Sequence, residues 1–141
     1  MSKFYPFEIQ PFPVLDRTGS TFLVTCHPHN NVGMRLMIRS QKGAFIGDMV
    51  FAFDGAEDVH IADFSIESGF DRKGLGTAVM AELFIVFRRR GIRTLTGICK
   101  SYRRKPADKE NLAKWYESLG FILTREISPD PGYLGKLKKT L

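Results

Sequence analysis

At residues 64–77 the sequence reads FSIESGFDRKGLGT. Alternating apolar and polar residues at its start predict the end of a strand, and the apolar spacing that begins at its end predicts a helix. The first turn of a helix presents unpaired backbone amides and the positive end of the helix dipole, which together favour an anion. Gly74 and Gly76 let the backbone approach a ligand closely, and Arg72 and Lys73 add positive charge. The stretch therefore predicts a phosphate-binding loop.

Two common kinds of phosphate loop do not fit this spacing. A dinucleotide-binding fingerprint needs a third glycine where Val79 stands, and an acidic ribose partner roughly 20 residues later. A P-loop needs a lysine directly after Gly74, and that residue is Leu75. Both classes of nucleotide-binding protein are therefore excluded.

The sequence pattern changes at this loop. Before it, β-branched and aromatic residues predict strands, and after it two segments with helical apolar spacing alternate with further strands. Gly91 is placed to end the first helix and Gly120 the second. The order predicts an α+β, or mixed α/β, architecture built around one twisted sheet. We expect strands at residues 21–26, 34–39, 45–53, 59–66, 92–99, 121–127 and 133–137, and helices at 75–90 and 106–119.

Composition limits the class of protein further. A chain of 141 residues predicts a single domain over residues 1–141, and 43% hydrophobic with 26% charged residues is typical of a folded domain. No apolar run approaches the roughly 20 residues that a membrane-spanning helix needs. The N-terminal residues lack the pattern of a secretory signal, which predicts a cytoplasmic protein with Cys26 and Cys99 reduced. The net charge of +6 favours anionic partners.

Two segments of the sequence resemble the GNAT family of N-acetyltransferases. In the first, Phe64 and Ile66 stand at the apolar positions of the family's fourth strand, and residues 72–76 (RKGLG) stand at its pyrophosphate loop. In the second, residues 115–121 (WYESLGF) are similar to the family's Phe-Tyr-Glu-Lys-Leu-Gly-Phe segment. The two segments occur in the family's order, and the resemblance covers about residues 44–126.

The resemblance implies a transferase that uses acetyl-CoA. The strands expected at 59–66 and 92–99 would splay into a V, in which the pantetheine arm lies like an added strand. An acceptor amine would attack the thioester carbonyl directly, and the Ile66 amide would hydrogen-bond the developing oxyanion. No covalent enzyme intermediate is needed. The residues implied to bind acetyl-CoA are Phe64, Ile66, Arg72, Lys73, Gly74, Leu75, Gly76 and Thr77.

The same resemblance implies two catalytic residues. Tyr116 stands where the family's tyrosine acid protonates the departing thiolate. Counting back from the loop, His60 stands at the position of the glutamate base of histone-modifying members, with Asp63, Glu67 or a water as alternatives. Strand alternation puts His60 and Asp63 on opposite faces unless a bulge intervenes.

The sequence also departs from the family's pattern. Most members carry two helices between their first and second strands, but residues 10–43 hold scattered Pro and Gly with β-alternation and no helical period. The acceptor site is therefore expected to be more open. Asp71 replaces the usual Gln or Arg, and Asn111 does not align with the family's asparagine before the second helix.

Other functions have weaker support in the sequence. Cys26, His27 and His29 suggest a metal, but adjacent strand residues face opposite ways and no second ligand pair follows, so we expect none. The basic runs at 88–90 and 103–105 suggest nucleic acid, although the first complements a helix C-terminus. In the family, a loop such as the second can meet the CoA 3′-phosphate through residues like its Arg103 and Arg104.

The alternative class is a non-catalytic acyl-CoA-binding or interaction module. The acceptor amine, a small molecule or a peptide, does not follow from these residues. Dimers are common in the family, so the resemblance leaves a homodimer open.

Overall fold

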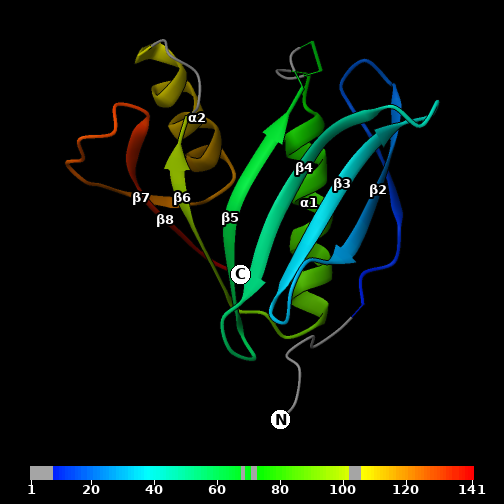
Figure 1. Cartoon of the computed structure of the whole chain (residues 1–141), viewed down its shortest axis with the longest axis horizontal. Coiled ribbons are helices and arrows are strands. Elements are labelled where there is room, and N and C mark those ends of the chain that lie inside the picture. The colour runs from blue at the N-terminus through cyan, green and yellow to red at the C-terminus, as the bar shows by residue number, and fades with distance from the viewer. Residues whose placement is uncertain (1–7, 68, 71–72, 102–105) are drawn as a thin grey trace.

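The computed structural model describes residues 8–67, 69–70, 73–101 and 106–141, and it contains one mixed sheet with two helices (Figure 1). The mixed α+β architecture predicted from the sequence is confirmed. In chain order the elements are β1 (Phe12–Leu15), β2 (Thr21–Pro28), β3 (Gly33–Ser40), β4 (Phe45–Phe53), β5 (Asp58–Ile66), α1 (Leu75–Arg89), β6 (Thr94–Lys100), α2 (Pro106–Ser118), β7 (Ile122–Arg125) and β8 (Tyr133–Thr140).

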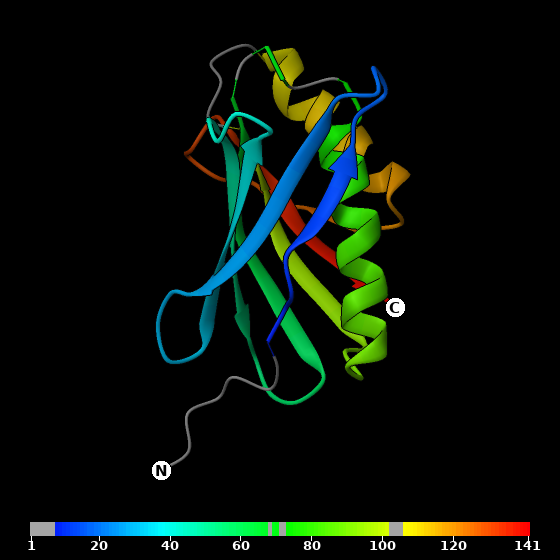
Figure 2. The same cartoon turned by 90° about the vertical axis from the view of Figure 1, so that its right-hand side faces the viewer.

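The sheet has eight strands in the order β1-β2-β3-β4-β5-β6-β8-β7. Neighbouring strands pair antiparallel except β5 and β6, which are parallel and are joined by α1. A parallel connection needs a long crossover, and α1 supplies it. Figure 2 shows α1 running along one face of the sheet while the opposite face of β2 to β4 carries no helix.

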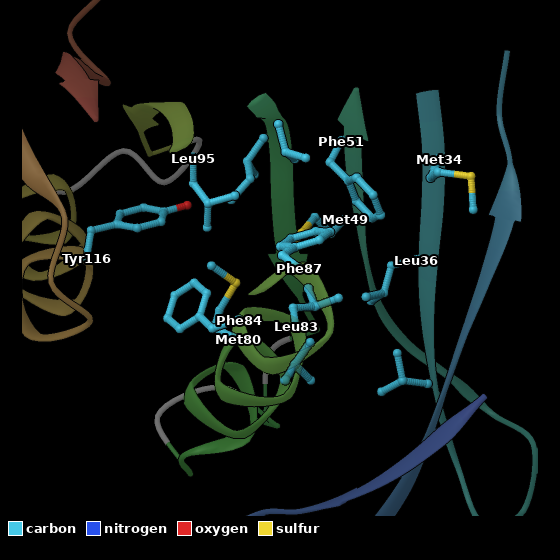
Figure 3. Packing of buried hydrophobic residues seen from close by; sticks show 14 of the residues in the cluster. Met34, Leu36, Met49, Phe51, Met80, Leu83, Phe84, Phe87, Leu95 and Tyr116 are labelled. Atoms are coloured by element: carbon cyan, nitrogen blue, oxygen red, sulfur yellow. The ribbon is translucent and has the colours of Figure 1, made fainter. Parts of the chain in front are cut away.

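The core lies between α1 and the sheet. Strand alternation buries Leu36 and Phe51, and Phe87 of α1 packs edge-on against Phe51 with ring centroids 5.5 Å apart (Figure 3). Fully buried apolar side chains of this kind each contribute roughly 1.5–3 kcal/mol to folding. The buried residues of α1 recur at helical spacing, as expected: Leu75, Val79, Met80, Leu83, Phe84 and Phe87.

Several strands begin or end at residues other than the predicted ones. The strand expected from residue 92 begins at Thr94, because the Ile92 amide bonds the Phe87 carbonyl at the end of α1. The strand expected at 121–127 is shorter and ends at Arg125. β1 was not expected at all, since it is only four residues long and contains Pro13. The expected absence of helices from residues 10–43 is confirmed.

Within the part of the chain that the structure describes, neither helix has the length and apolar character that crossing a membrane requires.

The packing of α1 gives a stability prediction. Leu83 is 1% exposed and Ile85 is 39% exposed on the same helix. We expect Leu83→Ala to lower the free energy of unfolding by about 2–5 kcal/mol, because a cavity is left in the core, and Ile85→Ala to lower it by less than about 1 kcal/mol. Urea denaturation measures both, and equal losses would contradict the packing described here.

Candidate functional site

The two parallel strands separate before they end. β5 and β6 pair only from Asp58↔Thr94 to Ile61↔Gly97, although β5 continues to Ile66 and β6 to Lys100. β4 holds the rest of β5 through Gly47↔Ile66, and β8 holds the rest of β6. The sheet therefore opens into a V-shaped splay, as the family resemblance implies.

A β-bulge in β5 lies where the splay begins. The register with β4 shifts between Val50↔Asp63 and Phe51↔Ile61, which leaves Ala62 as an extra residue. Bulges bend a strand and increase its local twist. This bend accompanies the separation of β5 from β6.

The splay exposes a row of backbone groups. Glu67 donates its amide to the Ile46 carbonyl of β4 at 2.7 Å. Successive residues of a strand direct their amides to opposite edges, so the amides of Ile66 and Phe64 point away from β4 and into the splay. An extended ligand lying there would meet an unpaired strand edge.

The start of α1 lies at the open end of the splay. Gly74 caps the helix with φ 81°, a left-handed conformation that favours glycine. The first helical hydrogen bond runs from the Ala78 amide to the Gly74 carbonyl, so the amides of residues 75–77 precede it. The N-cap residue, Gly74, has no side chain to cap these amides, and the first turn of α1 contains no acidic residue. The arrangement favours an anion.

A cavity of about 410 Å³ joins the splay to the start of α1. Of the predicted acetyl-CoA residues, it brings together Phe64, Ile66, Gly74, Gly76 and Thr77. The side chains and backbone that line it come from the β1–β2 hairpin, β5, α1, the end of β6 and α2. They are Arg17, Phe64, Ser65, Ile66, Gly74, Gly76, Thr77, Lys100, Ser101, Asp108, Asn111, Leu112 and Trp115.

The other three residues predicted to bind acetyl-CoA do not line the cavity or fall outside the residues that the structure describes. The Leu75 side chain is buried in the core, which leaves only its backbone amide for a ligand. Lys73 is exposed beside the cavity and does not line it. Arg72 falls outside the described residues, as do Asp71, Arg103 and Arg104.

Trp115, the only tryptophan of the chain, forms one wall of the cavity. Its indole nitrogen donates to the Thr77 hydroxyl at 2.9 Å, and its ring lies 5.9 Å from that of Phe64. A Cβ at Gly76 would stand 3.1 Å from the Trp115 ring, closer than an ordinary contact. The lack of a side chain at Gly76 therefore lets α1 lie close to α2, and it also leaves the Gly76 backbone accessible from the cavity.

Several of the residues that line the cavity are not indicated by any local pattern in the sequence. Arg17 belongs to a hairpin that precedes the quoted loop by four strands, and no local pattern connects the two. Asn111, which does not align with the family's asparagine, nevertheless lines the cavity from α2. Lys100 also lines it and pairs with Asp130 at 2.8 Å.

Tyr116 lies behind the cavity wall and does not line the cavity. The side chain is 5% exposed and packs edge-on against Phe121 with centroids 5.5 Å apart. Figure 3 shows its hydroxyl pointing toward Leu95 of β6. Burial raises the pKa of Tyr116 well above its usual range, and nearby Cys99 and Asp63 raise it further. The hydroxyl therefore keeps its proton at neutral pH.

Of the three candidate bases, His60 lies where β5 pairs with β6, and Asp63 and Glu67 lie beyond that pairing. His60 pairs with Ala52 and Asp63 pairs with Val50, on the same side of the sheet. Regular alternation would place the two on opposite faces, and the bulge at Ala62 brings them to one face. His60 Nδ1 lies 2.9 Å from the Thr96 hydroxyl, within the paired part of the strands. Asp63 lies beyond the last β5–β6 pair, and Glu67 is exposed after the end of β5.

Other chemistry has no support among the described residues. No group of three His, Cys, Asp or Glu side chains in that part of the chain could hold a metal ion. Cys26 and Cys99 are free thiols, and burial raises the pKa of Cys26 to about 12 and that of Cys99 to about 11. Such thiols are poor nucleophiles near neutral pH.

Comparison with protein families agrees with this geometry. The model of the acetyltransferase (GNAT) family matches residues 2–121, which is most of the chain. The chain belongs to the GNAT family. No curated protein matches it in sequence.

Solved structures of other proteins share the fold at low sequence identity. The GNAT domain of PAT from S. lividans has a TM-score of 0.71 and 16% identity, over 93% of this chain and 97% of that chain. A GNAT acetyltransferase from Elizabethkingia anophelis, solved with acetyl-CoA bound, has a TM-score of 0.62 and 13% identity, over 84% and 98%. Ard1 from Thermoplasma volcanium has a TM-score of 0.62 and 16% identity, over 76% and 70%.

This GNAT chain differs from the expected family pattern in its N-terminal half. The two helices that the resemblance implies after the first strand are absent from residues 10–43, where residues 16–20 join β1 to β2 and residues 29–32 join β2 to β3. The sheet face that carries His60 and Asp63 has no helix over it among the described residues. An acceptor could approach the candidate bases from this side.

The buried tyrosine gives a pH prediction. In the unfolded chain Tyr116 ionises near pH 10, whereas burial raises its pKa in the folded chain. Folding stability is therefore unaffected by this group below about pH 10 and falls as the pH rises above it. Between about pH 8 and pH 11, we expect the parent to lose more unfolding free energy than Tyr116→Phe, by up to about 1.4 kcal/mol per pH unit above pH 10. Equal losses in urea denaturation would contradict the buried, protonated hydroxyl.

Proposed function

We propose that the chain is a single-domain N-acetyltransferase that transfers the acetyl group of acetyl-CoA to a primary amine. The observation that carries the proposal is the splay of β5 from β6, which opens a strand edge directly beside the start of α1, where the N-cap residue is Gly74. A long ligand with an amide-bearing arm and a phosphate end matches both features. The acetyl-CoA bound by the related structure from E. anophelis is of this kind.

In this proposal each part of the cavity binds one part of acetyl-CoA. The backbone of Phe64 and Ile66 hydrogen-bonds the pantetheine arm as an added strand would. The amides of Leu75, Gly76 and Thr77 bind the pyrophosphate at the positive end of the α1 dipole. Arg72 and Lys73 add charge there, and the Trp115 ring forms an apolar wall for the arm.

The reaction needs positioning more than covalent catalysis. The amine nitrogen attacks the thioester carbonyl carbon, the carbon–nitrogen bond forms, and the carbon–sulfur bond breaks to release CoA as a thiolate. The Ile66 amide is proposed to stabilise the oxyanion of the tetrahedral intermediate, because it points into the splay. The amine loses one proton to a base and the thiolate gains one from an acid.

Tyr116 is the proposed acid. Its raised pKa keeps the hydroxyl protonated at neutral pH, so a proton is present, and the same shift makes the hydroxyl a weaker acid than an exposed tyrosine. Its hydroxyl lies on the α1 side of the sheet, whereas His60 lies on the other side. A thioester held between the strands would then meet the acid from one face and the amine from the other.

His60 is the proposed base, and Asp63 and Glu67 are the alternatives. His60 bonds Thr96 at the closed end of the splay, where the thioester would lie. Asp63 lies on the same face, and it is the one of the three whose charge contributes to the raised pKa of Tyr116. His60 and Asp63 are therefore both placed to act as the general base.

A second function is favoured by one observation. Tyr116 does not line the cavity, which is what a non-catalytic acyl-CoA-binding module would tolerate. Such a module would bind acetyl-CoA as tightly and release no CoA with any amine.

Trp115 offers a direct test of cofactor binding. We expect acetyl-CoA to change the fluorescence of this single tryptophan and to give a saturable calorimetric isotherm. The double variant Gly74→Glu and Gly76→Glu should remain without response, because two carboxylates would fill and repel the phosphate site. The variant's circular dichroism controls for folding. A folded parent that does not bind acetyl-CoA would refute the proposed function.

Kinetic variants test the catalytic assignments. We expect Tyr116→Phe to lower kcat by about 10²-fold or more while leaving the Kd for acetyl-CoA unchanged. His60→Gln and Asp63→Asn should identify the base. Only the variant that removes the base should lower kcat as much as Tyr116→Phe does and shift the pH dependence of kcat. CoA release with a panel of amines measures all three. A Tyr116→Phe variant with unchanged kcat would exclude the tyrosine as the acid.

A further inference from the structure

The turn of the β1–β2 hairpin lies against the start of α1. The Arg17 amide donates to the Lys73 carbonyl at 2.7 Å, directly before Gly74. A Cβ at Gly74 would stand 2.8 Å from Arg17 Cγ and 3.3 Å from its Cδ and Nε. The Arg17 side chain therefore extends across the Gly74 backbone, and it lines the cavity.

The hairpin turn is held in one conformation by Asp16. Asp16 Oδ1 accepts from the Thr18 amide at 2.9 Å, the Thr18 hydroxyl at 2.6 Å and the Ser20 amide at 3.1 Å. The Asp16 amide in turn donates to the Ser20 carbonyl at 3.1 Å. Asp16 is only 9% exposed. This network fixes the backbone from which Arg17 projects.

We propose that Arg17 is a further cofactor-binding residue, which binds the pyrophosphate of acetyl-CoA together with the first-turn amides of α1. The proposal rests on the proposed function. A guanidinium group presents a planar fork of donors that matches two phosphate oxygens at once, and it remains charged at every physiological pH. The amides of residues 75–77 and the Arg17 side chain reach the same end of the cavity from different directions.

The contact also gives Gly74 a second role. Its φ of 81° already favours glycine, and any side chain would in addition displace Arg17. The phosphate site is thus completed by a segment outside the loop that the sequence identifies, and β1 and its turn become part of the site.

The proposal is tested by calorimetric titration of the full chain with acetyl-CoA and with dephospho-CoA, which lacks the 3′-phosphate. We expect Arg17→Gln, which keeps the aliphatic stem, to weaken both ligands equally, by about tenfold to a hundredfold. Arg17→Lys keeps the charge but loses the fork of donors, so we expect its affinity to lie between those of the parent and Arg17→Gln. Arg93→Gln is the matched control, because it also removes one positive charge. Arg93 directly precedes β6, at the end of that strand away from the cavity, and pairs with exposed Glu57, so this variant should bind both ligands like the parent.

Several results would overturn the assignment. Arg17→Gln binding acetyl-CoA like the parent would remove Arg17 from the site, and a loss confined to acetyl-CoA would assign it to the 3′-phosphate instead. Equal losses in Arg17→Gln and Arg17→Lys would show that its charge does not bind the ligand. A parent that binds neither ligand would refute the proposed function itself, which distinguishes that failure from the failure of Arg17 alone.

Discussion

The end of the β5–β6 pairing at Ile61 and Gly97 is the constraint on which the site depends. The two strands are held from outside, β5 by β4 as far as Ile66 and β6 by β8 as far as Lys100. Neither strand can therefore collapse onto the other to satisfy its free edge. Backbone groups left unpaired away from water are costly, so this edge is suited to a ligand that supplies the missing hydrogen bonds.

Helix α1 connects this opening to the stability of the whole domain. Its C-terminal half packs Leu83 and Phe87 onto the sheet, and its first turn presents the amides of residues 75–77 beside the cavity. Gly76 and Thr77 bring it against Trp115 of α2, which joins the two helices across the cavity wall. The amides are thus fixed by the same packing that forms the core, and little ordering is left to be done when a ligand binds.

Local patterns in the sequence predicted the features that depend on neighbouring residues. The apolar spacing of α1, the alternation of β3 and β4, and the glycine loop were all found in this way. The bulge at Ala62 was not predicted, because it shows only in the register between two strands. Arg17 was missed because its place depends on the β1–β2 hairpin, and β1 is too short to give a period. The burial of Tyr116 likewise depends on how α2 packs, since its apolar stripe fits both a core and a catalytic residue.

Amide hydrogen exchange with and without acetyl-CoA tests the central claim most directly, because it reports on the edge of β5 itself. The account predicts that saturating acetyl-CoA slows exchange of the Phe64 and Ile66 amides, which point into the splay, and leaves the Glu67 amide, already bonded to Ile46, little changed. Binding of acetyl-CoA without protection of Phe64 and Ile66 would contradict it.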